Sequence, residues 1–435
     1  MKNKIPYYII GIALAISFSA NAQPKKVKAK ANELAESVEA KMIEWRHDFH
    51  QYPELSNREF NTAKKIASHL KGLGLEVQEN AAKTGVVGIL KGGKPGPVIG
   101  LRADIDALPV TERVKLPWAS TEKSSYNGIE TGVMHACGHD THIAILMATA
   151  EVLTKMKADL RGTVKFVFQP AEEGTPPGEE GGAKLMVKEG VLKNPDVEVM
   201  YGLHINSLTP VGTVAYKSGG TMAAADRWVM NIQGKQSHGS TPWTSIDPIV
   251  TAAQIITGMQ TIISRQTELT KEAAVLTVGV IRGGIRNNII PESVEMIGTI
   301  RTLNVDMQTK LHADFQRVAT NIGEAMGAKV DLEIENHVPV TYNNPELTAK
   351  TVPFIEDMIG KGNVKTRKAM TGAEDFSFYA NEVPSFFFFV GGCPEGTDPA
   401  EAAPHHTPDF YVDDSGMKTG VKAMLAATLG YMYNQ

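Results

Sequence analysis

Four short runs of almost uninterrupted apolar residues recur along this chain, with helical segments between them. The runs span residues 98–101, 164–168, 197–203 and 385–390. Strands of this kind are typical of a sheet that is covered on both faces, whereas a half-exposed strand alternates polar and apolar residues. Helical stretches at 141–157 and 183–188 lie between the runs, and an amphipathic helix from Leu34 to Phe49 ends near Pro53. The alternation predicts an α/β fold with helices layered on a large sheet.

A second pattern interrupts the first. Strand and helix periodicities follow one another in the order βαββαβ, with strands at 228–233, 274–282, 294–301 and 329–335 and helices at 248–265 and 307–326. Such a unit forms a small two-layer domain of its own. We therefore predict an inserted domain at 221–337, with segments 23–220 and 338–435 forming the larger domain.

The N-terminal residues resemble an export signal. Lys2 and Lys4 precede a mostly apolar stretch at 7–18, and Ala20-Asn21-Ala22 offers the small-x-small pattern that a signal peptidase recognises. The stretch is shorter than the ~20 residues of a spanning helix, which disfavours a membrane anchor. The expectation is a signal peptide at 1–22, a mature chain from Gln23, and a periplasmic or secreted protein without a membrane span.

Charge and cysteine content exclude several classes of protein. The chain has 44 Lys and Arg against 48 Asp and Glu, a net charge of −4, and no basic block of the kind that nucleic-acid binding requires. Its 2 Cys residues are too few for a disulfide framework, which leaves only the pair Cys137 and Cys393 to consider. A large enzyme or a binding protein for small molecules remains.

Polar clusters stand where the predicted strands end, and this is the edge at which open α/β sheets place their sites. The clusters contain Arg102, Asp104 and Asp106; Glu172 and Glu173; His204; His405 and His406; and, before a predicted helix, His135, Cys137, His139 and Asp140. Converging thiolate, imidazole and carboxylate groups suit zinc or a similar first-row ion.

Each cluster also has a plain structural interpretation. A single His is more often a satisfied core residue than a ligand, and Cys137 alone would be a small apolar side chain. Cys137 as a covalent nucleophile beside His139 is conceivable, but it leaves Glu172, Glu173 and His406 without a role. The sequence contains neither His-Glu-x-x-His nor Gly-x-Ser-x-Gly, which excludes the zincin helix and the nucleophile elbow.

The motifs together resemble a known family. From about Arg46 to the C-terminus the chain is similar to the aminoacylase/carboxypeptidase family of dimetallo-hydrolases, in particular the branch of indole-acetyl-amino-acid and hippurate amidohydrolases. The motifs that carry the resemblance include Arg102-Ala-Asp-Ile-Asp-Ala-Leu-Pro109, Met134-His-Ala-Cys-Gly-His-Asp140, Gln169-Pro-Ala-Glu-Glu173, Thr371-Gly-Ala-Glu-Asp-Phe376 and His406-Thr-Pro408.

The resemblance implies a site with two divalent metal ions, zinc or manganese first and cobalt or nickel as alternatives. The implied ligands are Cys137 (as the bridge between the ions), His139, Glu173, His204 and His406. His405 is expected to be a bystander, and Arg102 stands where more distant relatives carry a ligand His. Metal coordination would keep Cys137 as a thiolate and disfavours a disulfide with Cys393.

The resemblance also implies the catalytic and substrate-binding residues. Glu172 is the expected general base and Asp104 the residue that orients ligands. The inserted domain is the expected lid and dimerisation domain of a homodimer, in which His238 stabilises the oxyanion in the partner's site. Asn288 and Arg301 are the expected substrate contacts. Trp243 departs from the branch, whose members usually carry a second His there, and this departure leaves the substrate preference open.

The implied reaction is hydrolysis of the amide bond of an N-acyl-amino acid by a metal-activated water. The first alternative is a metallocarboxypeptidase or dipeptidase that uses the same site on a short peptide. The second alternative, of a different class, is a non-catalytic binding protein on this fold. In the second case we would expect ligand residues to be missing, and here none is.

Overall fold

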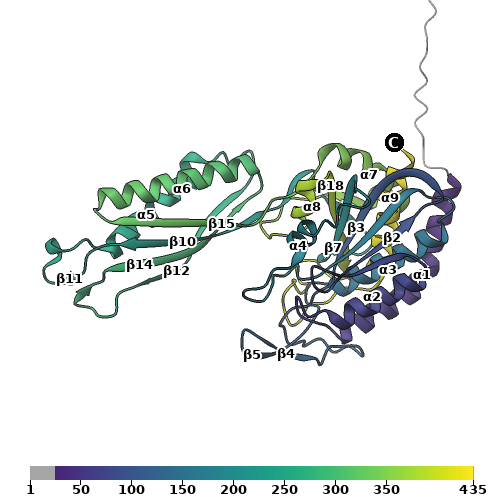
Figure 1. The fold of residues 1–435 in the computed structure, drawn as a ribbon, viewed down its shortest axis with the longest axis horizontal. Helices are drawn as coiled ribbons and strands as arrows, with labels where there is room; N and C mark the ends of the chain where they lie inside the picture. Colours follow the sequence, from purple (N-terminus) through teal and green to yellow (C-terminus); the bar gives the residue numbers. More distant parts are fainter. Residues whose placement is uncertain (1–24, 435) are drawn as a thin grey trace, which may run out of the picture.

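The large lobe is built on an eight-stranded mixed sheet (Figure 1). The computed structural model describes residues 25–434. The strands, in sheet order, are β1 (Glu76–Ala81), β2 (Gly85–Lys91), β6 (Arg161–Gln169), β3 (Lys94–Asp104), β7 (Val199–Pro210), β18 (Ser385–Cys393), β8 (Val214–Tyr216) and β17 (Val364–Thr366). The central neighbours β6, β3, β7 and β18 run parallel, so their carboxyl ends meet at one edge.

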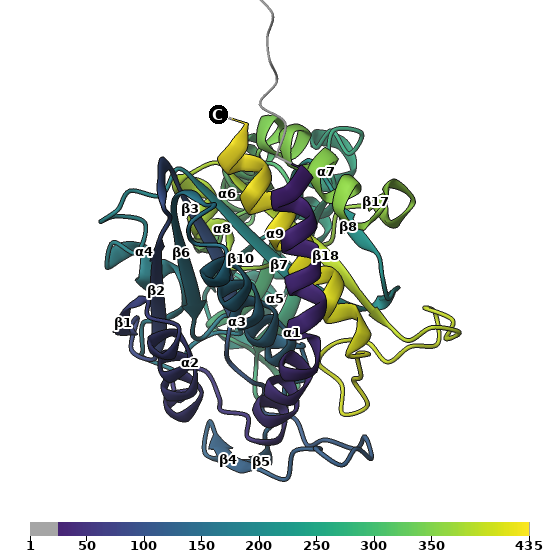
Figure 2. The same ribbon diagram turned by 90° about the vertical axis from the view of Figure 1, so that its right-hand side faces the viewer.

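Helices cover both faces of this sheet (Figure 2). One face carries α1 (Lys25–Gln51), α2 (Phe60–Gly72), α3 (His139–Lys155), α7 (Pro345–Ile359) and α9 (Ser415–Tyr433), and the other carries α4 (Gly182–Lys188) and α8 (Ser377–Glu382). In β18, Phe386 and Phe388 join the first buried cluster, while Phe387 and Phe389 join the second. The uninterrupted apolar run is therefore a strand with two buried faces, and the predicted α/β fold is confirmed.

The small lobe has four antiparallel strands in the order β12-β14-β10-β15, with two helices on one face. Along the chain the elements are β10 (Ala224–Gln233), α5 (Pro248–Thr261), β12 (Ala274–Gly283), β14 (Ser293–Thr302), α6 (Val305–Ala325) and β15 (Lys329–Val338). Trp228 is fully buried and meets the Phe315 ring edge-on at 5.1 Å between ring centroids. This ring contact joins the sheet to α6 within one buried core that is otherwise mostly aliphatic.

The fold also contains short helical turns and a two-stranded ladder in the small lobe. A π-helical turn, η2 (Ile262–Gln266), follows α5 directly, and two 3-10 turns are η1 (Pro242–Thr244) and η3 (Lys361–Asn363). A ladder of β11 (Ser237–His238) and β13 (Ile289–Ile290) lies at the end of the small lobe that points away from the large lobe (Figure 1).

Two segments connect the lobes and pair with each other. They are β9 (Gly219–Met222) and β16 (Thr341–Asn343), which run antiparallel. The predicted domain boundaries at 221 and 337 stay predictions, although the change from one lobe to the other occurs beside them. Among residues 25–434, none of the helices combines the length and the apolar character that crossing a membrane requires. The predicted signal peptide at 1–22 lies outside the described residues.

Candidate metal centre

The five side chains predicted as ligands meet at the carboxyl edge of the parallel strands. Cys137 lies two residues before His139, which is the first residue of α3. Glu173 lies in the loop after β6, His204 lies in β7, and His406 lies in the loop after β18. Segments far apart in the sequence therefore supply one cluster, because parallel strands end on the same side of the sheet.

The ligand atoms are close to one another, with the thiol at the centre. Cys137 Sγ lies 3.3 Å from His204 Nε2 and 3.2 Å from His406 Nε2. Glu173 Oε1 lies 3.0 Å from His406 Nε2 and 3.9 Å from His139 Nε2. The thiol thus faces imidazoles on both sides, and the carboxylate faces two of the three imidazoles.

A glycine makes the turn between Cys137 and His139 at the start of α3. Gly138 has a φ of +94°, and a Cβ atom on it would stand 2.3 Å from Ile205 Cγ2. Only glycine fits such a backbone conformation and so close an approach of the neighbouring strand. This turn brings Cys137 and His139, one residue apart on either side of it, into the same cluster.

His139 is oriented by its backbone contact and leaves one nitrogen without a partner. Its Nδ1 donates to the backbone oxygen of Asp106 at 2.8 Å. Its Nε2 is buried without a hydrogen-bond partner within residues 25–434, and it faces Glu172 Oε2 at 4.0 Å. A buried nitrogen lone pair aimed at carboxylates is the arrangement that a bound cation completes, so the residues fit a metal site.

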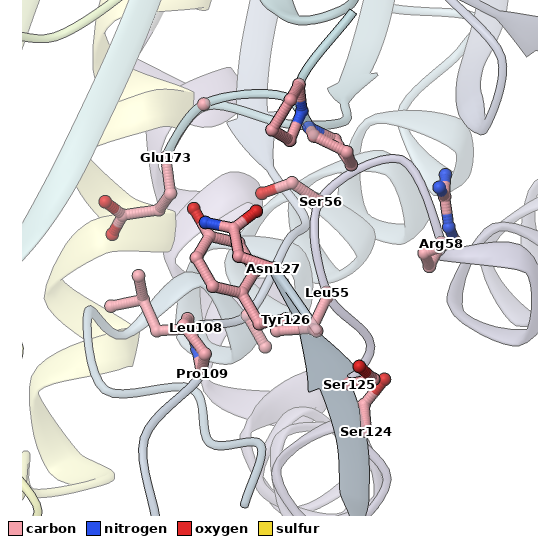
Figure 3. A pocket seen from close by; sticks show the side chains of 14 residues that line it. Leu55, Ser56, Arg58, Leu108, Pro109, Ser124, Ser125, Tyr126, Asn127 and Glu173 are labelled. Atoms are coloured by element: carbon pink, nitrogen blue, oxygen red, sulfur yellow. The ribbon is translucent and has the colours of Figure 1, made fainter. Parts of the chain in front are cut away.

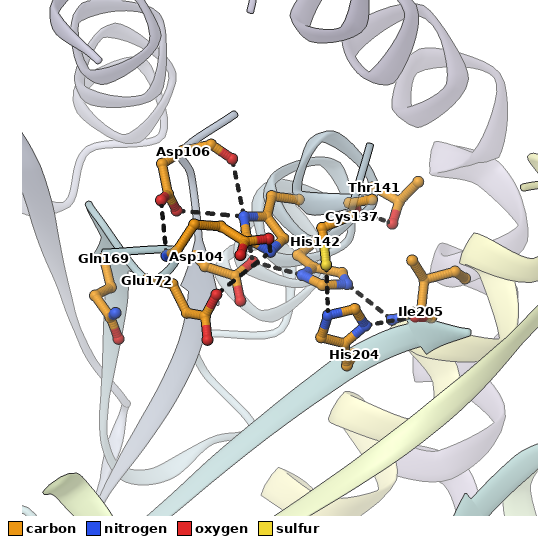
Figure 4. A network of polar contacts seen from close by, with 12 residues as sticks. Asp104, Asp106, Cys137, Thr141, His142, Gln169, Glu172, His204 and Ile205 are labelled. Atoms are coloured by element: carbon orange, nitrogen blue, oxygen red, sulfur yellow. Dashed lines mark hydrogen bonds and ion pairs between the residues drawn. The ribbon is translucent and has the colours of Figure 1, made fainter. Parts of the chain in front are cut away.

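A second histidine of α3, which is not among the predicted site residues, supports the cluster. His142 Nδ1 lies 2.5 Å from Asp104 Oδ1, and its Nε2 accepts the Ile205 N–H at 2.8 Å (Figure 4). His142 therefore fixes the strand beside His204 and is not free to bind a metal. Its position three residues after His139, on the same helix face, was the available signal.

Arg102 joins three carboxylates behind the cluster. Its guanidinium lies 2.6 Å from Asp104, 2.8 Å from Glu374 and 2.9 Å from Asp375, and all four residues are buried. Gln169 also donates to Asp375 at 2.7 Å. Asp104, predicted to orient ligands, thus has both oxygens engaged, one by Arg102 and one by His142. The motif that contains Glu374 and Asp375 was visible in the sequence, but their pairing with Arg102 was not.

Burial and neighbouring negative charges raise the pKa values of two side chains in the cluster. Burial, followed by Glu173 and Glu172, raises the pKa of the Cys137 thiol well above its usual range. Burial, followed by Glu374 and Glu173, raises the pKa of Glu172 likewise. So many buried acidic groups around one thiol favour a bound cation and disfavour Cys137 as a free nucleophile. Both Cys137 and Cys393 are free thiols in the structure.

The neighbouring residues His405 and His406 have different surroundings. His405 Nδ1 lies 3.1 Å from the backbone oxygen of Cys137, and its Nε2 accepts the Ser207 N–H at 3.2 Å. Both ring nitrogens are thus engaged by the backbone, and burial lowers the pKa of His405 to about 3. His406 adopts a φ of +63°, which is rare for residues other than glycine. Residues in such conformations cluster at functional sites.

One sequence expectation about a strand was wrong. We expected a strand at 197–203 with His204 directly after it, but β7 continues to Pro210. The parallel partner β18 extends the pairing, with His204 opposite Phe389 and Pro210 opposite Cys393. Pairing with this neighbour extends β7 beyond the apolar run from which its end was expected.

The predicted lid residues do not join this cluster within one chain. His238 and Asn288 lie in and beside the β11–β13 ladder, which Figure 1 shows at the end of the small lobe away from the large one. His238 is exposed, and its Nδ1 accepts from Ser240 Oγ at 2.6 Å. Arg301 pairs with Ala225 across β14 and β10, at the end of the sheet beside the connection to the large lobe.

Comparisons with known proteins agree with this geometry. A family model described as peptidase family M20/M25/M40 matches residues 100–429. The chain is 37% identical to thermostable carboxypeptidase 1 of Saccharolobus solfataricus over 394 residues, 89% of this chain and 94% of the relative. A solved structure of the Bacillus subtilis YXEP protein, titled a dinuclear metal binding peptidase of the M20 family, has a TM-score of 0.77 and 32% identity, covering 92% and 100% of the two chains.

Two Bacillus subtilis relatives correct the prediction of export. The chain is 36% identical to N-acetyl-L-cysteine deacetylase over 383 residues, 88% of this chain and 86% of the relative. It is 36% identical to N-acetylcysteine deacetylase over 378 residues, 87% and 93%. The comparison with these enzymes contradicts export, so the predicted periplasmic or secreted location is wrong. That prediction rested on two lysines, a short apolar stretch and a small-x-small pattern at residues 20–22, and such short patterns are not specific to signal peptides.

Proposed function

Because the chain belongs to peptidase family M20/M25/M40 and is a metal-dependent hydrolase, we propose that it cleaves the amide bond of N-acyl-amino acids, giving a carboxylate and a free amino acid. The observation that carries the proposal is the position of Glu172. It is an acidic group beside the cluster of thiol, imidazole and carboxylate ligands, with Oε2 4.0 Å from His139 Nε2. Glu172 is not one of the five proposed ligands, so its carboxylate is available for proton transfer.

We propose that two divalent ions, zinc or manganese before cobalt or nickel, bind to this cluster. The ligands would be Cys137, His139, Glu173, His204 and His406, with Cys137 between the two ions. The central place of the Cys137 thiol among the other ligands supports this assignment. Such a pair of ions, when bound, supplies a water of lowered pKa and polarises the carbonyl that is attacked.

Glu172 would move the proton. Its carboxylate takes a proton from the attacking water and passes it to the amide nitrogen, so that the amino acid leaves as a neutral amine. Asp104 would act as a positioning residue, since it holds His142 and Arg102 rather than facing the substrate. The position of Glu172, whose side chain is only 11% exposed, supports this role, because partial exclusion of water makes a positioned proton acceptor more effective.

The remaining groups would come from the small lobe of a homodimer. We propose that His238 of one subunit stabilises the oxyanion in its partner's site, and that Asn288 and Arg301 bind the α-carboxylate. Arg301 has neither an ion pair nor a hydrogen bond through its side chain within residues 25–434, so its guanidinium is available. Trp243 and Ile285 are 78% and 97% exposed on the same lobe.

Mixing two inactive variants tests the sharing of sites between subunits. His238→Ala and Glu172→Gln should each be nearly inactive as homodimers. If His238 acts across the interface, unfolding and refolding them together should restore about a quarter of the wild-type activity, because half of the dimers would contain one intact site. Refolding His238→Ala with Asn288→Ala, two defects from the same lobe, is the matched control and should restore nothing. Equal activity in both mixtures would exclude a shared site.

A substrate panel tests the proposed reaction. Metal-free protein reloaded with each metal in turn should hydrolyse N-acetyl, N-benzoyl or indole-acetyl amino acids with higher kcat/KM than dipeptides. The similarity to thermostable carboxypeptidase 1 makes peptidase activity the second candidate, and a preference for dipeptides would favour it. Metal-loaded protein that is inert towards the whole panel would support the non-catalytic binding protein instead.

A further inference from the structure

The residues on either side of Glu172 are held by buried carboxylates. The Ala171 N–H donates to Glu59 Oε1 at 2.9 Å, and the Glu173 N–H donates to Asp106 Oδ2 at 3.0 Å. Glu59 and Asp106 are 0% and 1% exposed, so water does not compete for these two contacts. The backbone is therefore fixed directly before and directly after the residue that we propose as general base.

One short segment before α2 supplies one of these carboxylates and supports the other. Segment 56–59 contains Glu59, and its Ser56 hydroxyl donates to Asp106 Oδ2 at 2.7 Å. Ser56 also lines a cavity of about 440 Å³ together with Glu173, so the segment and the loop after β6 face each other (Figure 3). Both backbone contacts of that loop therefore depend on the same part of the chain.

Ala171 needs a partner because its backbone conformation is unfavourable. Its φ is +52°, in the left-handed region, where a Cβ atom comes too close to the following carbonyl oxygen. Such conformations persist only where the surrounding structure holds them. The turn at Ala171 sets the direction of the next residue, Glu172, whose Oε2 lies 4.0 Å from His139 Nε2. A change at Ala171 would therefore move the Glu172 carboxylate relative to the ligand cluster.

Glu59 reaches this loop without contacting the ligand cluster. Its second oxygen accepts the Thr84 hydroxyl at 2.6 Å, and neither Thr84 nor Ala171 is a proposed ligand. Burial, followed by the charge of Asp106, raises the pKa of Glu59 to about 8. A protonated carboxyl group still has an oxygen that accepts a hydrogen bond, so the contact with the Ala171 N–H does not require a negative charge.

We propose that Glu59 is a positioning residue for the reaction, which directs Glu172 by holding the Ala171 backbone in its left-handed turn; the inference rests on the role of Glu172 in the proposed function. Asp106 makes the parallel contact with the Glu173 N–H, but its Oδ1 also lies 3.3 Å from Nδ1 of the proposed ligand His139. Substitution of Glu59 therefore separates the geometry of the loop from metal binding, whereas substitution of Asp106 would change both.

Three substitutions of Glu59 separate geometry from charge, with hydrolysis of an N-acetyl amino acid by the metal-loaded protein as the assay. Glu59→Gln keeps the length and an acceptor oxygen, and should keep kcat within about threefold of wild type. Glu59→Asp keeps the carboxylate but is one methylene shorter, and Glu59→Ala has no acceptor. Both should lower kcat about 10- to 100-fold with unchanged KM and metal content, because Glu172 is misplaced while the ligands remain.

Glu54→Ala is the matched control. Glu54 lies in the same connection between α1 and α2, and its carboxylate also holds backbone N–H groups, those of Asn61 at 3.1 Å and Thr62 at 2.8 Å. These residues belong to the start of α2 and not to the loop that carries Glu172. Glu54→Ala should therefore keep the wild-type kcat, and an equal loss in Glu54→Ala and Glu59→Ala would overturn the inference.

Hydrogen exchange of the peptide around Ala171, followed by mass spectrometry, measures the contact independently of activity. Exchange should be faster than wild type in Glu59→Asp and unchanged in Glu59→Gln, and these two variants decide the question if Glu59→Ala does not fold. Faster exchange with wild-type kcat would overturn the inference and leave the proposed function intact, as would an active Glu59→Asp beside an inactive Glu59→Gln. Loss of metal would assign the effect to Glu173 and would also overturn it. Wild-type protein that cleaves no N-acetyl amino acid would reject the proposed function, while the exchange rates would still show whether Glu59 holds the loop.

Discussion

Glu172→Gln should lower kcat about 10²- to 10⁴-fold while the protein keeps its full metal content. Glutamine has nearly the same shape as glutamate and can still form hydrogen bonds, but it cannot take a proton from water. The loss should therefore appear in kcat, with a much smaller change in KM. Steady-state kinetics with an N-acyl-amino acid, combined with elemental analysis of the same sample, measures both quantities.

Glu180→Gln provides the matched control for this substitution. Glu180 lies on the same loop, is exposed, and pairs with Lys188 at 3.0 Å, away from the ligand cluster. It should retain wild-type kcat. A Glu172→Gln variant with near-wild-type turnover would contradict the role of Glu172 as general base. A variant that loses its metal would indicate that Glu172 is a ligand.

Cys137→Ala should have the largest effect on metal content. The thiol lies within 3.3 Å of His204 Nε2 and 3.2 Å of His406 Nε2, and no other side-chain atom occupies this central position among the proposed ligands. Its removal takes a donor from both proposed ions, and loss of a ligand weakens metal affinity by far more than the 10- to 100-fold typical of supporting residues. Elemental analysis after dialysis should find less than one ion per chain.

Cys393→Ala tests whether this effect belongs to the ligand cluster or to any buried cysteine. Cys393 is fully buried at the end of β18, and its thiol faces the backbone oxygen of Thr397 at 3.7 Å. Its substitution should leave the metal content at the wild-type level. Equal metal loss in both variants would assign the effect to destabilised packing. Unchanged metal content in Cys137→Ala would contradict the bridging role.

Much of the fold could be predicted because apolar runs and periodic apolar residues indicate which faces of strands and helices are buried. The apolar run 385–390 became a strand with two buried faces, since both faces of its sheet are covered. The βαββαβ order of the small lobe followed from periodicity in the same way. The length of β7 could not be predicted, because its extension beyond His204 depends on pairing with a strand that lies about 180 residues later in the chain.

The candidate site could also be predicted only in part, because some of its contacts join distant segments of the chain. Residues at strand ends and before α3 could be identified from the sequence, because sheet topology brings such positions together. The ion pairs of Arg102 with Glu374 and Asp375, and the contact of His142 with Ile205, could not be predicted, since they join distant segments of the chain. Export was predicted from two lysines, a short apolar stretch and the small-x-small pattern at residues 20–22, which are less specific than the motifs of the candidate site.

One titration tests the central claim, that this cluster holds two ions which the hydrolysis requires. Metal-free protein is titrated with zinc or manganese while hydrolysis of an N-acyl-amino acid is followed. Activity should rise from near zero and reach its plateau at two ions per chain. A plateau at one ion per chain, or full activity in the metal-free protein, would contradict the two-ion centre.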